Sequence, residues 1–205
     1  MKDTVIVFAR APRLGAVKRR LAKEIGDRAA LRFHMTTLRG LLRDLARCRR
    51  FDVVLAVTPD HAWFRLPMRV QRIGQGHGGL GQRMTRALRP YRRVVLMGCD
   101  IPLAGAADAC AAFRALGVAD AVFGPAEDGG YWLIALGPRR PTDLFGDARW
   151  SSEHALADTL RQFRGHRVRF VRQLSDVDTA EDYRRHFSRP PGNPSAPGHP
   201  APPAA

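Results

Sequence analysis

The sequence predicts an α/β fold in which a mostly parallel sheet is flanked by helices on both faces. Short apolar runs rich in Val and Ile, bounded by turn residues, are typical of buried strands. These runs alternate with helical patterns through the first half of the chain, which favours parallel strands. Between Asp120 and Leu136 two strands follow each other without a helix, so we expect a mixed sheet there. The 205 residues suffice for a single domain.

Strands and helices are expected in a regular order. The strands are predicted at Thr4–Ala9, Asp52–Val57, Arg69–Ile73, Arg93–Met97, Asp120–Phe123, Tyr131–Leu136 and Arg167–Val171. The helices are predicted at Val17–Glu24, Arg28–Ala46, Leu80–Leu88, Ala106–Leu116, Glu153–Phe163 and Ala180–Phe187. In the longest helix, steps of three and four predict one buried face made of Leu31, Met35, Leu38, Leu42 and Leu45.

The composition changes after Phe187, where the chain becomes rich in Pro, Gly, Ala and Ser. Such a segment cannot bury enough apolar surface to offset the entropy of ordering. We therefore expect a folded domain over residues 1–187 and a disordered tail over residues 188–205.

The formal net charge is +15, and nearly all of the positive charge is arginine, since the only lysines are Lys2, Lys18 and Lys23. A basic excess permits binding to nucleic acid or to a membrane surface. The arginines are scattered along the sequence, and no aromatic residues alternate with them as a stacking platform requires. A nucleic-acid-binding module is therefore a minor alternative.

The cysteine spacing and the hydropathy of the chain indicate its cellular compartment. Cys48, Cys99 and Cys110 have no zinc-binding spacing, and their odd number argues against a disulfide framework. The first apolar run is too short for a signal peptide, and no stretch approaches the roughly 20 apolar residues of a membrane span. We expect a cytoplasmic protein without a membrane span; the sequence indicates no oligomeric state.

The loop after the first predicted strand is the most informative stretch, because it carries Arg10, Arg13, Lys18, Arg19 and Arg20. A helix N-terminus favours an anion, and Arg and Lys side chains suit phosphate. Open α/β sheets bind ligands at the carboxyl ends of their strands. The loop predicts a site for a phosphorylated molecule, above all a nucleotide, and an ordinary basic surface loop is the alternative.

Acidic residues follow two other predicted strands. Asp100 comes directly after the strand that ends near Gly98, and Glu127 and Asp128 precede Gly129-Gly130. Mg²⁺ and Mn²⁺ take oxygen ligands and bridge carboxylates to phosphates. Asp100 is thus a candidate metal ligand, while the glycines would let backbone approach a ligand closely. Turn or capping roles explain the same residues without a ligand.

Two further stretches give weaker candidates. Gly76, Gly78 and Gly79 precede a predicted helix that carries Arg83 and Arg86, so this loop is a second candidate anion-binding site. His77 in the loop is a candidate acid or base, but a single loop histidine is more often only solvated.

In the second stretch, Asp178 or Thr179 would cap the last helix, with Glu181 or Asp182 in its first turn. Asp176 is then a surplus acid that could reach a metal.

Taken in order, six motifs resemble the DUF2064 family of GT-A-type transferases, often described as radical-SAM-associated glycosyltransferases. They span nearly all of residues 4–187 and read Phe8-Ala9-Arg10-Ala11-Pro12 with Gly15, Val17-Lys18 and Arg20-Leu21; Gly81-Gln82-Arg83-Met84; Gly98-x-Asp100-x-Pro102-Leu103; Gly124-Pro125-Ala126-Glu127-Asp128-Gly129-Gly130-Tyr131; Trp150-Ser151; and Asp176-x-Asp178-Thr179-x-Glu181-Asp182.

The resemblance implies a Rossmann-like GT-A fold, similar more distantly to 2-phospho-L-lactate and molybdenum-cofactor guanylyltransferases. In those families the first loop holds nucleotide phosphates, and the Asp that matches Asp100 binds Mg²⁺. The chain departs from the family pattern at Leu14, Gly79 and Ile101, which stand for Pro, an acid and a small or polar residue. These changes bear on acceptor or base specificity, and a member that binds nucleotide without turnover is compatible with them.

The expected activity is transfer from a nucleotide-diphospho-sugar donor to an unknown small-molecule acceptor, with Mg²⁺ or Mn²⁺ as cofactor. A nucleotidyltransferase that uses an NTP and a phosphorylated acid and releases pyrophosphate is the alternative. The predicted catalytic residues are Asp100 and Asp128, and the predicted metal ligands are Asp100, Asp176 and Asp178. The predicted nucleotide-binding residues are Ala9, Arg10, Arg13, Gly15, Lys18, Arg20, Gly81 and Arg83. The predicted substrate-binding residues are Gly129, Gly130, Tyr131, Trp150 and Ser151.

Overall fold

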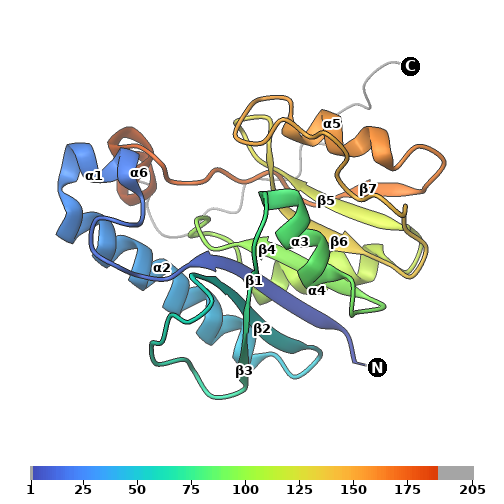
Figure 1. Cartoon of the computed structure of the whole chain (residues 1–205), viewed down its shortest axis with the longest axis horizontal. Helices are drawn as coiled ribbons and strands as arrows, with labels where there is room; N and C mark the ends of the chain where they lie inside the picture. Colours follow the sequence, from blue (N-terminus) through green and yellow to red (C-terminus); the bar gives the residue numbers. More distant parts are fainter. Residues whose placement is uncertain (1, 189–205) are drawn as a thin grey trace.

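A seven-stranded sheet forms the centre of the computed structural model, which describes residues 2–188 (Figure 1). Its strands are β1 (Thr4–Arg10), β2 (Asp52–Thr58), β3 (Val70–Gly74), β4 (Val94–Gly98), β5 (Ala121–Pro125), β6 (Tyr131–Leu136) and β7 (Val168–Phe170). Their order across the sheet is β3-β2-β1-β4-β6-β5-β7. Of the predicted disordered tail, residues 189–205 lie outside the described residues.

Only β6 runs against the other strands of the sheet. It pairs antiparallel with β4 on one side and with β5 on the other, whereas β1, β2, β3 and β4 pair in parallel. β7 returns parallel to β5. The mixed region predicted between Asp120 and Leu136 is confirmed, because β5 and β6 form a direct hairpin with no crossover helix between them.

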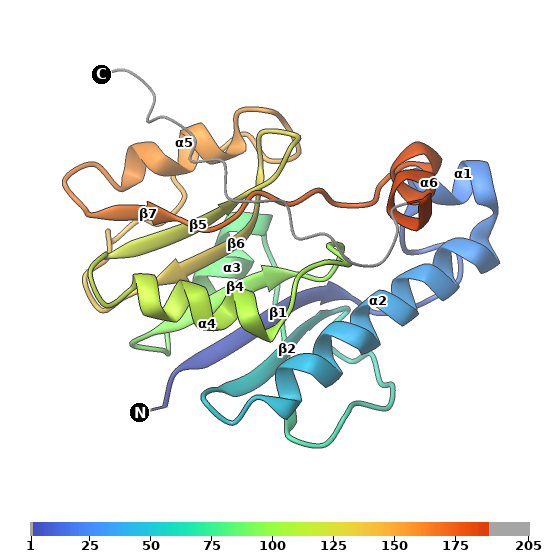
Figure 2. The same cartoon turned by 180° about the vertical axis from the view of Figure 1, so that it is seen from behind.

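Helices cover both faces of the sheet, as expected (Figures 1 and 2). They are α1 (Arg19–Ile25), α2 (Asp27–Arg47), α3 (Leu80–Leu88), α4 (Ala106–Ala115), α5 (Ala155–Gln162) and α6 (Ala180–Ser188). One apolar core lies between the sheet and the helices α2 and α4, and a second lies between the sheet and the helices α3 and α5. A third, smaller core joins α1 and α6 to the N-terminal part of α2.

The buried face of α2 differs in part from the predicted one. Leu38, Leu42 and Leu45 are buried as expected, but Leu31 and Met35 are only half-buried. The N-terminal half of α2 projects toward α1 and α6 rather than onto the sheet, so a different set of side chains is covered there. Within residues 2–188, no helix is long and apolar enough to cross a membrane.

Candidate active site

The loops after β1, β4 and β5 leave the same edge of the sheet, since these three strands point the same way. β1 lies between β2 and β4, so the chain reverses its direction across the sheet at this point. Ligands of open α/β sheets bind in the crevice outside the carboxyl ends of the strands at such a reversal. The register pairs Phe8 with Gly98, which sets the basic loop after β1 beside Asp100.

Lys18 lies between two of the predicted metal ligands and forms an ion pair with each. Its Nζ lies 3.1 Å from Oδ2 of Asp100 and 2.7 Å from Oδ1 of Asp178. The Lys18 side chain is 4% exposed, whereas both carboxylates are 41% exposed. Lys18 has left-handed backbone angles (φ 48°, ψ 47°) and precedes α1, which therefore begins at Arg19 rather than at the predicted Val17. This turn directs the lysine inward to a point between two acids from distant parts of the chain.

The charges of this group stabilise one another. Burial by itself would lower the pKa of Lys18, but Asp100 and Asp178 outweigh burial and raise it. Burial would likewise raise the pKa of Asp100, but the nearby His34 ring, the charge of Lys18 and the hydrogen bond from Cys99 hold it well below its usual range. Lys18 is thus a cation and Asp100 an anion at neutral pH.

His34 is a site residue that the sequence analysis missed. It is 3% exposed on α2; its Nε2 lies 3.0 Å from the carbonyl oxygen of Arg10, and its Nδ1 lies 3.8 Å from Oδ1 of Asp100. The Cys99 thiol donates to the same Asp100 oxygen at 3.2 Å. The sequence feature that could have identified His34 is its position on the buried face of α2, four residues before Leu38, where a polar side chain is unusual.

The segment after β7 brings its acids to the same crevice. The amide of Leu174 donates to the carbonyl of Pro125 at the end of β5, and the amide of Val177 donates to the carbonyl of Asp100. Burial is the main reason why the pKa of Asp176 is raised to about 6. The charges of Asp178 and Asp128 raise it further, and the charge of Lys18 opposes the shift. The structure therefore brings together the predicted acids of three motifs.

Thr179 and Asp182 form the predicted cap of α6. The amide and hydroxyl of Thr179 donate to Oδ2 of Asp182 at 2.9 and 2.8 Å, and the amide of Asp182 donates back to the Thr179 hydroxyl at 3.2 Å. The capping interpretation is confirmed for this pair. Because Thr179 does the capping, the carboxylate of Asp178 is available to Lys18.

The other predicted phosphate ligands lie at the end of β1, in the loop after it and at the start of α1. Arg10, Arg13 and Arg20 are exposed, and within residues 2–188 none of them lies within ion-pairing distance of an acid. Ala9 is buried at the end of β1, and Gly15 takes a positive φ of 71° in the turn that follows. Arginines without acidic partners keep their N–H donors for solvent or for an anionic ligand.

The glycine-rich loop before α3 is fixed mainly by contacts within the protein. Arg83 donates to Oε1 of Gln75 at 2.9 Å, and Nε2 of Gln75 donates to the carbonyl of Ala9 at 3.0 Å. Arg86 donates to the carbonyls of Gln75 and His77. A Cβ on Gly81 would lie 3.2 Å from the Trp150 ring, so this glycine permits close packing of α3 against Trp150.

The turn between β5 and β6 packs against the segment before α5. Gly129 has φ 81°, and a Cβ there would lie 2.2 Å from the carbonyl oxygen of Glu153, so the close approach that this glycine permits is to the chain itself. Tyr131 packs edge-on to Trp150 with ring centroids 6.3 Å apart. Asp128 is exposed and accepts a hydrogen bond from the Gly130 amide at 2.9 Å, and Ser151 is exposed with φ 59°.

The donor set is compatible with a divalent cation. Asp100, Asp176 and Asp178 offer carboxylate oxygens, the ligands that Mg²⁺ and Mn²⁺ prefer. His34, Cys99 and Asp100 also offer ligand atoms within 4.8 Å of one another. Burial is the main cause of the raised pKa of Asp176, and the charges of Asp178 and Asp128 add to it.

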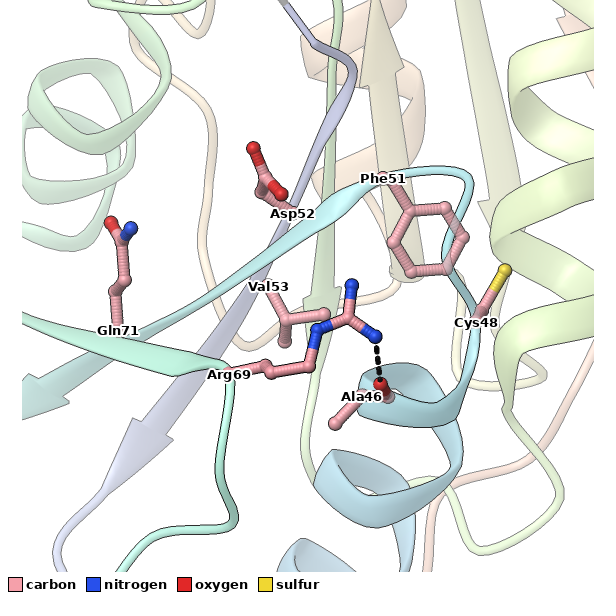
Figure 3. A pocket seen from close by; sticks show the side chains of 7 residues that line it. All are labelled: Ala46, Cys48, Phe51, Asp52, Val53, Arg69 and Gln71. Carbon is pink, nitrogen blue, oxygen red and sulfur yellow. Dashed lines mark hydrogen bonds between the residues drawn. The ribbon is translucent and has the colours of Figure 1, made fainter.

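A small pocket lies at the other end of the strands, away from the crevice (Figure 3). It lies where α2 ends and β2 begins, and Arg69 closes it by donating to the carbonyl of Ala46 at 3.2 Å. Asp52 is the only acid that lines it, and its carboxylate accepts from Lys2 at 2.8 Å. The pocket contains none of the predicted site residues.

Comparisons with known proteins agree with this fold. A candidate nucleotide-diphospho-sugar transferase from Desulfovibrio desulfuricans G20 is 30% identical, with a TM-score of 0.84, covering 91% of this chain and 87% of that one. Rv0371c from Mycobacterium tuberculosis H37Rv is 22% identical with a TM-score of 0.55, covering 92% of this chain and 99% of that one. A 4-diphosphocytidyl-2C-methyl-D-erythritol synthase from Anaerococcus prevotii DSM 20548 is 13% identical with a TM-score of 0.56, covering 92% and 99%. No curated protein matches the chain.

Fold and structural neighbours define a transferase with the fold of the nucleotide-diphospho-sugar transferases. The chain belongs to the DUF2064 family, whose model, described as an uncharacterized protein conserved in bacteria, matches residues 41–152. The family resemblance seen in the sequence is thereby confirmed.

Proposed function

We propose that this chain is a cytoplasmic, metal-dependent transferase that uses a nucleotide-diphospho-sugar donor. The observation that carries the proposal is the placement of Lys18 between Asp100 and Asp178 at the crevice where β1 and β4 end. An ammonium group has three donors, and among the described residues Lys18 has these two acceptors. In this proposal its remaining N–H binds a phosphate oxygen of the donor.

The basic loop supplies the rest of the phosphate contacts in this proposal. Arg10, Arg13 and Arg20 bind the donor diphosphate together with Lys18, because they are exposed cations at the same edge. The guanidinium fork matches phosphate oxygens in a bidentate manner. Ala9, Gly15, Gly81 and Arg83 shape the nucleotide site through backbone position and packing.

Asp100, Asp176 and Asp178 would hold Mg²⁺ or Mn²⁺. When bound, the cation supplies charge neutralisation to the departing diphosphate. A manganese complex of Rv0371c is known, and that protein shares this fold. His34 and Cys99 orient the Asp100 carboxylate, since both contact its Oδ1.

Asp128 orients the acceptor in this proposal, because its carboxylate is exposed in the turn after β5 and lies near enough to Asp176 to contribute to the raised pKa of Asp176. Gly129, Gly130, Tyr131, Trp150 and Ser151 form the wall beside it. In glycosyl transfer, an acceptor oxygen attacks the anomeric carbon, the bond from that carbon to the diphosphate breaks, and a nucleoside diphosphate leaves. The protein contributes positioning and electrostatic stabilisation.

Nucleotidyl transfer is the second candidate. The Asp-x-Asp-Thr motif at residues 176–179 resembles that of guanylyltransferases, and it lies in the crevice, with Asp178 2.7 Å from Lys18. In this reaction the acceptor attacks the α-phosphorus of an NTP and pyrophosphate leaves.

Thermal-shift titration with a panel of nucleotide sugars and NTPs, each with Mg²⁺, Mn²⁺ or EDTA, tests the proposal. We expect one nucleotide-sugar group to raise the melting temperature only when the metal is present. Product analysis by ³¹P NMR then separates the two reactions: a nucleoside diphosphate supports sugar transfer, whereas pyrophosphate rejects it in favour of the alternative. Equal stabilisation with metal and with EDTA contradicts the metal site.

A further inference from the structure

The outer side of α2 carries a stripe of exposed arginines. Arg28, Arg32, Arg39, Arg43 and Arg47 follow one another at spacings of four, seven, four and four residues, which places them along one side of the helix. Within residues 2–188, none of the five lies within 4 Å of an acidic oxygen. The arginines that are scattered in the sequence are therefore gathered in space.

Large apolar side chains stand exposed beside this stripe. In the loop between β2 and β3, Trp63 is 83% exposed and Met68 is 90% exposed. Arg39, Arg43 and Arg65 line one hollow together with Leu66, Pro67 and Met68. Figures 1 and 2 both show this loop alongside α2.

The exposure of Trp63 is imposed by its neighbours. Arg72 of β3 donates to the carbonyls of Ala62 and Phe64 on either side, and its guanidinium stacks over the Phe64 ring at 5.0 Å. Ala62 is buried in the core. The tryptophan is thus held outward between two anchored residues.

Nearby acids do not neutralise the stripe. Asp44, on the same helix, accepts from the amide of Ala106 at 2.7 Å and so caps α4. Asp60, at the start of the loop, accepts from the amide of Gly76 at 3.0 Å. The stripe and the loop, residues 28–47 and 62–68, therefore form a positively charged surface with an apolar centre, which we call the α2 face.

We propose that the α2 face docks on an anionic lipid bilayer. Tryptophan is favoured at the level of the lipid headgroups, and arginines attract anionic lipids while their stems cover apolar surface. Exposed Trp and Met side chains surrounded by cations match this chemistry. A strand of nucleic acid would instead need several aromatic rings in series, and Trp63 is the only exposed aromatic ring on this face.

Vesicle co-sedimentation tests the proposal with the full chain. Vesicles of phosphatidylcholine alone are compared with vesicles that contain equal parts of phosphatidylcholine and phosphatidylglycerol. We expect binding only to the second, with a blue shift of Trp63 fluorescence that is absent from Trp63→Phe. Trp132 is 3% exposed, and Trp150 packs against the core on the α3 and α5 side of the sheet, away from α2, so neither should report on the bilayer.

A pair of double variants with equal charge change isolates the α2 face. Arg39→Ala/Arg43→Ala should weaken binding to the anionic vesicles about 30-fold, at roughly a factor of five for each arginine near a charged bilayer. Arg164→Ala/Arg169→Ala removes two exposed arginines near β7 and should weaken binding less than threefold. Circular dichroism checks that both variants are folded.

Three results would overturn the proposal. The first is equal loss of binding in both double variants, which indicates attraction by net charge alone. The second is an unchanged Trp63 spectrum on anionic vesicles. The third is that short duplex DNA, and not vesicles, binds in a manner sensitive to Arg39→Ala/Arg43→Ala, which assigns the face to nucleic acid.

Discussion

Buried acids outside the crevice and the acids within it are neutralised in different ways. Asp120 lies within ion-pairing distance of Arg139 and Arg167, and Asp158 lies within that distance of Arg149 and Arg161. Each of these acids thus has two arginines to itself, and Asp108 has a bidentate pair with Arg172.

In the crevice, by contrast, Asp100 and Asp178 share Lys18, and Asp128 and Asp176 have no arginine or lysine within 4 Å among residues 2–188. The crevice acids therefore have fewer cationic partners within 4 Å than these buried acids, although the chain carries a net charge of +15. The comparison separates buried acids that are each paired with arginine from crevice acids that share one lysine or have no cationic partner, the pattern expected where a ligand completes the charge balance.

The largest effect is expected for Asp100→Asn. If the Asp100 carboxylate holds the metal, removing its charge should lower kcat/KM about 10³-fold, or roughly 4 kcal/mol of transition-state stabilisation. The increase in melting temperature on adding Mn²⁺ should disappear in the same variant. A variant that keeps its Mn²⁺ response would show that Asp100 belongs with the structural acids.

Lys18→Met and Arg19→Ala test whether the basic loop acts through one residue or through its overall charge. Losing one charge-assisted hydrogen bond of about 2–3 kcal/mol should weaken nucleotide binding about 30- to 160-fold in Lys18→Met. Arg19 is exposed and contacts no acid among the described residues, so Arg19→Ala should change affinity less than twofold. Isothermal titration gives both values, and similar losses would reduce the loop to a basic surface.

Asp108→Asn is the matched change in a structural acid. The Asp108 side chain is 7% exposed and accepts from Nε and Nη2 of Arg172 at 2.7 and 2.9 Å. Losing this pair should lower the free energy of unfolding by about 2 kcal/mol, discounted because Arg172 is half-exposed. Urea denaturation measures the loss, and kcat should remain unchanged. Lost activity with unchanged stability would place Asp108 among the ligand-binding acids.

Asp176→Asn should give the smallest change, and it should raise the free energy of unfolding rather than lower it. The folded pKa of Asp176, about 6, lies above its ordinary value of 3.8, so its ionisation destabilises the metal-free protein. In EDTA the variant should be more stable than the native chain by about 1–2 kcal/mol above pH 6, after allowance for solvent screening. The gain should decline between pH 6 and pH 4 and vanish below. A gain that is constant with pH would mean that Asp176 lacks the electrostatic strain inferred for it.

Local patterns sufficed to predict the elements of the fold. Strand positions followed from short Val- and Ile-rich runs, and the hairpin of β5 and β6 followed from two such runs without a helix between them. The bounds of β6 and α3 are those predicted, while most others moved by one or two residues. End positions depend on caps such as the left-handed Lys18, which no propensity at that position indicates.

By itself the sequence determined the α/β class, the family and the motifs that carry charge, because these depend on short-range patterns and on their order along the chain. Only the tertiary structure decided which charged groups meet. Lys18 and Asp178 are 160 residues apart in sequence, and His34 reaches Asp100 from a helix in which it looks like a core position. The same holds for the arginines of α2, since scattered positions become one surface only when a helix aligns them. Pairing across the crevice depends on strand order and loop closure, and neither is visible in local composition.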